Sequence, residues 1–362
     1  MSKSKAKKRK PFTIPDDVKL GFSTLISNEA VIKAGREMKG AKDIVPITLA
    51  LVAVILAILP TFVSRNSVRG SSAVFSAPTA NYEYGLSKFM NALVYEEDGT
   101  KRDNPIQVKI NDNGILEISD NDLKALGNSG DVATGETWYT VNRSSTALPY
   151  FEVFFNTTDD RDSNFFNFID SNQNPYTGGA RTLIHGETVT FQSSYIAFGK
   201  ESIRFRKRND TLTFSGVTGD YIRLHNTNLT EFALSLDAKN LPYVSEDYAK
   251  EITTYFTDIM DKSFETLKNT SLWTYTGIFA GVDLGAILLF GLVMFLMTRG
   301  KKNPFRVYTF WETQKMAYWA SFTPGLISLI GFALPNMSFI FFFMMYGLRM
   351  MWMSMKSLRP QA

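Results

Sequence analysis

Two charged residues lie inside segments of the chain that are otherwise apolar. Asp283 falls within the run Leu272–Met297, and Arg349 falls within the run Met337–Met355. An ionised side chain at the centre of a bilayer costs on the order of 3 kcal/mol, so such residues are expected to be paired or functional. A helical rise of 1.5 Å per residue places the two at similar depths, so we predict an intramembrane polar pair of Asp283 and Arg349.

An alternative leaves these two charges apart. Arginine has a long side chain that can extend to the membrane surface, so Arg349 could reach the cytoplasmic face. Asp283 would then stay protonated or bond a neighbouring hydroxyl such as Thr276 or Ser321.

Three glycines share one helix with Asp283. Gly277, Gly281 and Gly285 recur every four residues, which puts them on one face where another helix could approach closely. Asp283 lies about 200° from Gly281 at 100° per residue. We therefore predict that this glycine stripe packs against a helix and that the span is central in a bundle.

Other catalytic and metal-binding chemistry has little basis in the sequence. The chain has no cysteine and only two histidines, His185 and His225, on separate segments. The segment Asp160–Asn164 resembles the start of a calcium loop but lacks the required glycine and glutamate downstream. The cationic run Arg204–Arg208 could meet an anionic polymer, or could be a solvated strand face. We expect no catalytic residues, metal or cofactor.

Apolar runs of membrane-spanning length organise the chain. Ile44–Val63 is twenty residues without a charge, which suits an anchor better than the shorter apolar region of a signal peptide. We predict a four-span helical bundle with a β-rich α+β extracytoplasmic domain between spans one and two. The expected segments are a basic cytoplasmic tail with an amphipathic stretch (1–43), span one (44–64), the external domain (65–244), a stalk helix (245–271), span two (272–298), a loop (299–316), span three (317–335), span four (336–355) and a tail (356–362).

The distribution of charge predicts the orientation. Residues 1–43 hold eleven Lys and Arg against five Asp and Glu, whereas residues 65–271 hold twenty basic and twenty-eight acidic residues. Basic flanks of membrane spans stay in the cytoplasm. We expect a cell-membrane protein with both termini inside and 65–271 outside. The basic flanks are attracted to anionic lipid, and no nucleic-acid-binding motif accompanies them.

Alternation and turn residues describe the external segment. Ile106–Ile110 and Ile115–Ile118 flank a Gly-ended turn and predict a hairpin. Asp120–Leu126 is expected to be a short helix and 156–179 a long loop. Further strands are predicted at 138–141, 150–155, 188–191, 195–198, 202–206, 212–214 and 221–224. From Ser245 the apolar period becomes helical, with no Pro or Gly before the second span.

Two sequence blocks carry a family resemblance. They are GFSTLISNEAVIKAGREMKGAKDI before the first span and NPFRVYTFWETQKMAYWASFTPGLISLIGF before the last spans. The chain resembles uncharacterised membrane proteins of Gram-positive bacteria labelled maltodextrin-utilisation (MalA-type) proteins, and its last spans are distantly similar to the Yip-type membrane bundle. The resemblance implies an association with carbohydrate utilisation and no functional residues.

Two function classes follow. The first is a non-enzymatic membrane protein whose external domain binds a partner, such as a sugar ABC importer, or an envelope polymer, and which is accessory to maltodextrin uptake or envelope function. The second is a membrane sensor or transport component that uses Asp283.

Overall fold

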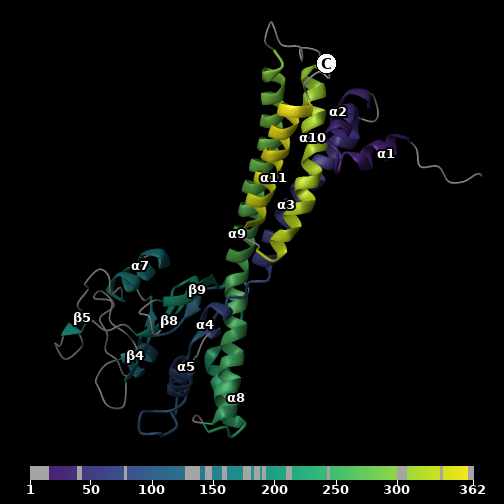
Figure 1. Cartoon of the computed structure of the whole chain (residues 1–362). Coiled ribbons are helices and arrows are strands. Elements are labelled where there is room, and N and C mark those ends of the chain that lie inside the picture. Colours follow the sequence, from purple (N-terminus) through teal and green to yellow (C-terminus); the bar gives the residue numbers. More distant parts are fainter. Residues whose placement is uncertain are drawn as a thin grey trace, which may run out of the picture. The chain divides into compact units, whose positions relative to one another are not determined.

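The computed structural model describes residues 16–38, 43–76, 80–126, 139–142, 149–156, 161–173, 181–182, 188–189, 193–208, 214–242, 245–299, 308–334 and 337–357. The chain forms two compact units, one made of residues 1–67 with 271–362 and the other of 68–270. Helix α9 (Glu246–Met297) is a single helix of 52 residues that contributes to both (Figure 1).

Three helical segments of the described chain are long and apolar enough to cross a membrane. They are α3 (Ile44–Asn66), α9, and Ser338–Met355, which contains α11 (Ser338–Trp352). The chain is therefore a membrane protein with an α+β composition. The fourth expected span corresponds to α10 (Phe310–Ile327) and the 3-10 turn η4 (Ser328–Phe332), a segment made less apolar by Glu312, Gln314 and Lys315.

Helix α10 runs beside α3 in the same direction along nearly its whole length. At one end the Lys315 Nζ lies 2.9 Å from the Asp43 carboxylate. Further along, a Cβ on Gly325 would lie 2.7 Å from the Cα of Ala53. At the far end the hydroxyls of Thr61 and Ser338 are 2.8 Å apart, where α11 begins.

Helices α9 and α11 also run parallel to each other. The ring centroids of Phe279 and Phe339 are 5.1 Å apart, and those of Phe290 and Tyr346 are 5.3 Å apart. Tyr346 donates a hydrogen bond from its hydroxyl to the carbonyl of Ala317 on α10. The four helices pack side by side (Figure 1).

The amphipathic stretch before α3 forms two helices rather than one. Helix α1 (Asp16–Ser23) ends before an elbow, and Ser27 caps α2 (Asn28–Glu37) by accepting a hydrogen bond from the Ala30 amide. Helix α2 packs closely on α10, since a Cβ on Gly35 would meet the Met316 side chain at 2.6 Å. Phe22 on α1 is exposed. The two helices therefore differ, since α2 packs on α10 while α1 leaves an apolar side chain exposed.

The unit of residues 68–270, called the external unit after its predicted location, is built on a five-stranded sheet among its described residues, in the order β3-β4-β7-β8-β9. Strands β4 and β7 pair in parallel and the other neighbours are antiparallel. These strands are β3 (Tyr139–Asn142), β4 (Pro149–Phe155), β7 (Ser194–Phe198), β8 (Ser202–Arg208) and β9 (Phe214–Asp220). Two short hairpins are β1 (Lys109–Ile110) with β2 (Leu116–Glu117), and β5 (Arg181–Thr182) with β6 (Thr188–Val189).

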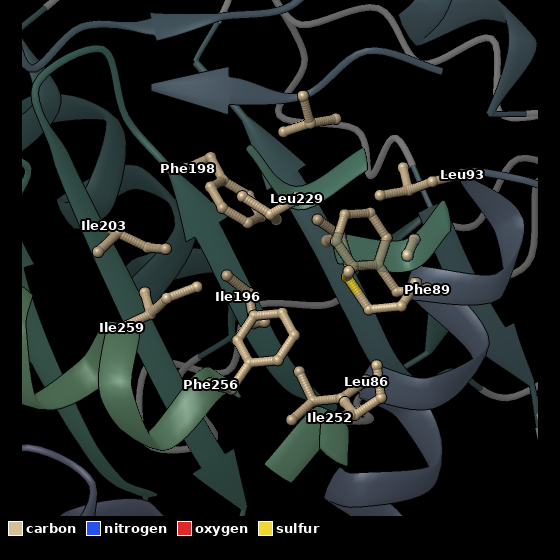
Figure 2. Close-up of a cluster of buried hydrophobic side chains, with 14 of the residues drawn as sticks. Leu86, Phe89, Leu93, Ile196, Phe198, Ile203, Leu229, Ile252, Phe256 and Ile259 are labelled. Atoms are coloured by element: carbon tan, nitrogen blue, oxygen red, sulfur yellow. The ribbon is translucent and has the colours of Figure 1, made fainter. Parts of the chain in front are cut away.

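Helices cover both faces of this sheet. On one face α5 (Ala80–Ala92), α8 (Leu229–Ala238) and the first part of α9 enclose the main core. On the other face α7 (Asp162–Gln173) covers a smaller cluster. Short helices α4 (Ser72–Phe75) and α6 (Asp120–Ala125) complete the described unit. Figure 2 shows Leu86, Phe89, Ile196, Phe198, Ile252 and Phe256 meeting in the main core.

Several sequence predictions agree with this fold. The predicted hairpin forms with its turn at Asn111–Gly114, where Gly114 has a φ of 70° and the Asn111 carboxamide accepts a hydrogen bond from the Asn113 amide. The short helix at 120–125 is capped by Ser119. The predicted strands at 138–141, 150–155, 195–198 and 202–206 match β3, β4, β7 and β8 closely.

Three predictions in this unit were wrong. Part of the expected loop 156–179 is helix α7, because Phe165, Phe166 and Ile169 give it an apolar side that packs on the sheet. The last strand runs on to 220, well beyond the predicted 212–214, of which 212 and 213 lie outside the described residues, and 221–224 is a turn instead of a strand. The cationic side of β8 is not a solvated face, since the Arg204 guanidinium stacks on the Phe166 ring at 4.6 Å.

The stalk helix is part of the external core. Its predicted start at Ser245 is correct, since the Ser245 hydroxyl accepts a hydrogen bond from the Tyr248 amide. The stripe Ile252, Phe256 and Ile259 is buried among the sheet residues, and Phe256 meets Phe205 edge to face. An external domain that ends at 244 would therefore lose one wall of its core.

We predict that residues 68–270 fold as an independent soluble unit and that the shorter segment 81–241 does not. The shorter segment lacks the α9 side chains that close the main core. Thermal melting followed by circular dichroism should show a cooperative transition only for the longer segment. Within it, Phe256→Ala should destabilise by about 3–5 kcal/mol, as expected for a buried phenylalanine.

Leu267→Ala is the matched control, because Leu267 lies on the same helix with 44% of its surface exposed. It should melt within about 0.5 kcal/mol of the parent. A cooperative melt of 81–241 with the same midpoint would contradict the role given to α9.

Candidate functional site

Asp283 is buried in the membrane unit. Its side chain has 0% exposure, and neither carboxylate oxygen has a hydrogen-bond partner among the described residues. Ile287 and Met294, one and three turns further along the same side of α9, belong to the apolar core of this unit. A carboxylate in such surroundings is stable only if it is neutral or meets a cation.

Arg349 does not supply that cation in this structure. Its guanidinium donates hydrogen bonds to the carbonyls of Thr24 and Ala320, to the Thr323 hydroxyl at 2.7 Å and to the Asn28 side chain at 3.2 Å. The predicted Asp283–Arg349 pair is therefore not formed. Arg349 points instead to α10 and the α1–α2 elbow, where neutral oxygens accept from four of its five N–H groups.

The hydroxyls proposed as substitutes are also engaged elsewhere. Thr276 donates to the Leu272 carbonyl and Ser321 donates to the Tyr318 carbonyl, each within its own helix. Of the alternatives drawn from sequence, a protonated Asp283 is the one compatible with this geometry.

The glycine stripe lies on the open side of α9. A Cβ added at Gly277, Gly281 or Gly285 would meet no described atom within 4 Å. The glycines and Asp283 lie on opposite faces of α9, as predicted. The predicted packing of a helix on the glycine stripe does not occur within the described chain. The covered glycine of α9 is instead Gly291, where a Cβ would lie 2.6 Å from the end of the Gln314 side chain of α10.

A second buried cation escaped the sequence reading. Lys315 is 2% exposed, and its ammonium donates to the Asp43 carboxylate at 2.9 Å and to the Met38 carbonyl at 2.7 Å. This ion pair joins the start of α3 to α10. The sequence prediction places Lys315 in the loop 299–316, whereas the structure places it in α10, whose following residues are apolar.

The external unit contains a pocket of about 200 Å³ that the sequence did not indicate. It lies among α5, α8 and the beginning of α9. Tyr95, Tyr248, Asn91 and Asp237 supply its aromatic and polar lining. Aromatic walls with a few directed polar groups are the usual composition of a small-ligand site.

Asp237 is the polar centre of this pocket. The Lys101 ammonium and the Tyr95 hydroxyl both donate hydrogen bonds to its carboxylate. These bonds hold the pKa of Asp237 below its usual range, with Lys101 the larger cause. The same carboxylate raises the pKa of Tyr95. Asp237 is therefore a charged acceptor at neutral pH, with its orientation set by two partners.

The remaining sequence candidates have structural roles or lie outside the described residues. Asp162, from the calcium-like segment, accepts hydrogen bonds from the amides of Lys200 and Glu201 and the hydroxyl of Ser202, so it organises the β7–β8 turn. His225 lies beside the turn glycine Gly114. His185 and Asp160 fall outside the described residues.

No family model, curated protein or solved structure matches the chain. The functional assignment therefore rests on the residues themselves. Two features stand out in them: the Asp237 pocket in the external unit and the buried Asp283 in the membrane unit.

We predict that Asp283 and Arg349 contribute independently to stability. Arg349→Gln should cost on the order of 2–3 kcal/mol, because it removes charge-assisted hydrogen bonds to several buried oxygens. Asp283→Asn should be neutral or stabilising, because it replaces a buried carboxylate that lacks a partner. Unfolding of the full chain in mixed micelles with increasing dodecyl sulfate measures both.

The double variant, Asp283→Asn with Arg349→Gln, tests whether the two contributions to stability are additive. Its loss should equal the sum of the single losses within about 0.5 kcal/mol. Partial recovery in the double variant, above that limit, would mean that the two side chains touch in the membrane.

Proposed function

We propose that this chain is a four-span membrane protein whose external unit binds a saccharide, as a non-enzymatic receptor or accessory component in carbohydrate uptake. The observation that carries the proposal is the course of α9. The same uninterrupted helix lines the external pocket with Tyr248 in its first turn and carries Asp283 in its apolar half. A ligand that contacts Tyr248 therefore contacts an element that continues into the bilayer.

The pocket chemistry suits a sugar ring. Tyrosine rings offer apolar surface to the C–H faces of a sugar, while the Asp237 carboxylate and the Asn91 amide can bond its hydroxyls. A volume of about 200 Å³ is smaller than the roughly 300–1,000 Å³ typical of pockets for drug-sized ligands. The pocket therefore suits one ring, such as the end residue of a maltodextrin.

Binding is favoured over hydrolysis by the same lining. Glycoside hydrolysis uses two carboxyl groups roughly 5–9.5 Å apart on either side of the bond. Among the described lining residues Asp237 is the one carboxylate, and it is already held by Lys101 and Tyr95. A fixed acceptor of this kind orients hydroxyl groups.

The four-span topology is supported by the register of α10 on α3. Contacts at Asp43, Ala53 and Thr61 show that α10 and the start of α11 match α3 from one end to the other. If α3 crosses the bilayer, α10 crosses it too, and a chain that leaves by α10 must return by α11. With the basic flanks inside, both termini are cytoplasmic and the external unit faces out.

Partners follow from this arrangement. A receptor of this kind needs a partner in the membrane, and a sugar ABC importer is the expected class. An envelope polymer is the alternative ligand of the external unit. The second candidate function, a sensor or transport component, is favoured by one observation, the Asp283 carboxylate buried without a hydrogen-bond partner.

We predict that single cysteines in this cysteine-free chain will report four spans. Thr100→Cys should react with an impermeant maleimide in intact protoplasts, and Asp16→Cys and Ser357→Cys should react only after lysis. Thr100 and Asp16 are exposed, so each thiol is accessible on its own side. Labelling of Ser357→Cys in intact protoplasts would indicate three spans.

We predict that the full chain in lipid nanodiscs binds maltotriose and that Asp237→Asn weakens binding about tenfold or more. The loss reflects a charge-assisted hydrogen bond of about 1.5–3 kcal/mol. Because the pKa of Asp237 is held low, affinity should be constant over about pH 5–8. Isothermal titration calorimetry measures both effects.

Asp258→Asn is the matched control, since it makes the same change at an exposed position on α9. It should leave the affinity unchanged. Absence of binding for maltotriose and for N-acetylglucosamine, or equal affinity of both variants, would contradict the receptor proposal.

A further inference from the structure

An apolar groove of about 360 Å³ lies in the membrane unit between α1 and the helices α3 and α10. It is independent of the external pocket. Its lining consists of aliphatic and aromatic side chains from three segments, chiefly Phe22, Leu25, Val45, Leu49, Trp319 and Phe322.

The groove exists because the two N-terminal helices pack differently. Helix α2 is drawn tightly onto α10 at Gly35. The elbow before it is held by Thr323, whose hydroxyl donates to the Leu25 carbonyl at 2.7 Å. Helix α1, on the other side of this elbow, lines the groove with Val18, Gly21 and Phe22, and the Phe22 side chain stays exposed.

The rim of the groove continues into the surface that faces lipid. Phe22 is 67% exposed, Ile26 93% and Ile44 67%. Ile44 and Val45 begin α3, the most apolar of the membrane-crossing helices. Exposed apolar side chains on a short helix beside a span are typical of a helix lying in the membrane interface. Acyl chains are therefore the material in contact with this opening.

A cation without a counter-ion lies next to the groove. Arg349 bonds Thr24 and Thr323, which are the sequence neighbours of the lining residues Leu25 and Phe322. All four of its hydrogen-bond acceptors are neutral, and no carboxylate among the described residues pairs with it. A negative charge is the missing complement.

We propose that this groove holds one acyl chain of an anionic phospholipid from the surrounding bilayer, with the phosphate drawn towards Arg349. The lipid chain fills the space that α1 leaves open, and its head group balances the guanidinium. The bound lipid thereby fastens α1 to the transmembrane bundle.

The test uses the purified full chain in detergent, equilibrated with equal amounts of phosphatidylglycerol and phosphatidylcholine and examined by native mass spectrometry. The parent protein should retain one phosphatidylglycerol with about fivefold preference over phosphatidylcholine, the preference expected for one basic residue at an anionic lipid. Leu49→Trp should abolish this retention by filling the groove. Arg349→Gln should remove the preference between the two lipids.

Leu51→Trp is the matched control, because Leu51 lies on the same helix, is 48% exposed and does not line the groove. It should retain lipid like the parent. Equal retention by Leu49→Trp and Leu51→Trp, or no preference in the parent protein, would overturn the proposal.

A second measurement needs no variant. Phosphatidylglycerol with a photoreactive group in its acyl chain, bound to the parent protein and washed with detergent, should crosslink to peptides containing 18–25, 45–49 or 319–322. Crosslinking confined to other peptides would equally overturn the proposal.

Discussion

The continuity of α9 is the constraint on which both units depend. In hydrocarbon every backbone amide and carbonyl must be satisfied within the protein, and an α-helix does this internally. No proline interrupts the 52 residues of α9. Its first part closes the external core through Phe256 and its neighbours, and its second part packs on α11 through Phe279 and Phe290. A break in this helix would therefore disturb two cores at once.

Buried charges then determine how the remaining helices are joined. Lys315 ties α10 to Asp43 at the start of α3, and Arg349 ties α10 and α11 to the elbow between α1 and α2. A buried cation that loses its acceptors is strongly destabilising, whereas a satisfied one restricts which segments can be neighbours. The polar residues inside this unit thus specify an arrangement that apolar packing alone would leave less well defined.

The sequence could predict the local elements of this structure better than the contacts between distant segments. Apolar length identified α3, α9 and α11, and alternation identified β7 and β8, because those signals are local. Helix α7 was hidden because an Asn- and Asp-rich composition usually means a loop, and only contact with the sheet reveals the use of Phe166. The hydrogen-bond partners of Arg349 could not be predicted, because the depth of a residue along a helix does not tell which neighbouring helix its side chain faces. The Asp237 pocket combines residues from 90 to 248, which no motif connects.

The two faces of α9 in the membrane show how these levels combine. Asp283 and Ile287 face the other helices, whereas Gly277 and Gly281 face away from them. A glycine facing lipid leaves no backbone group unsatisfied, because the helix bonds its own amides and carbonyls. The backbone hydrogen bonds of a helix cannot satisfy a side-chain carboxylate that faces lipid. The helix is therefore rotated about its axis so that the carboxylate faces the other helices. The orientation of α9 about its axis therefore follows from Asp283, and the open position of the glycines is a consequence of it.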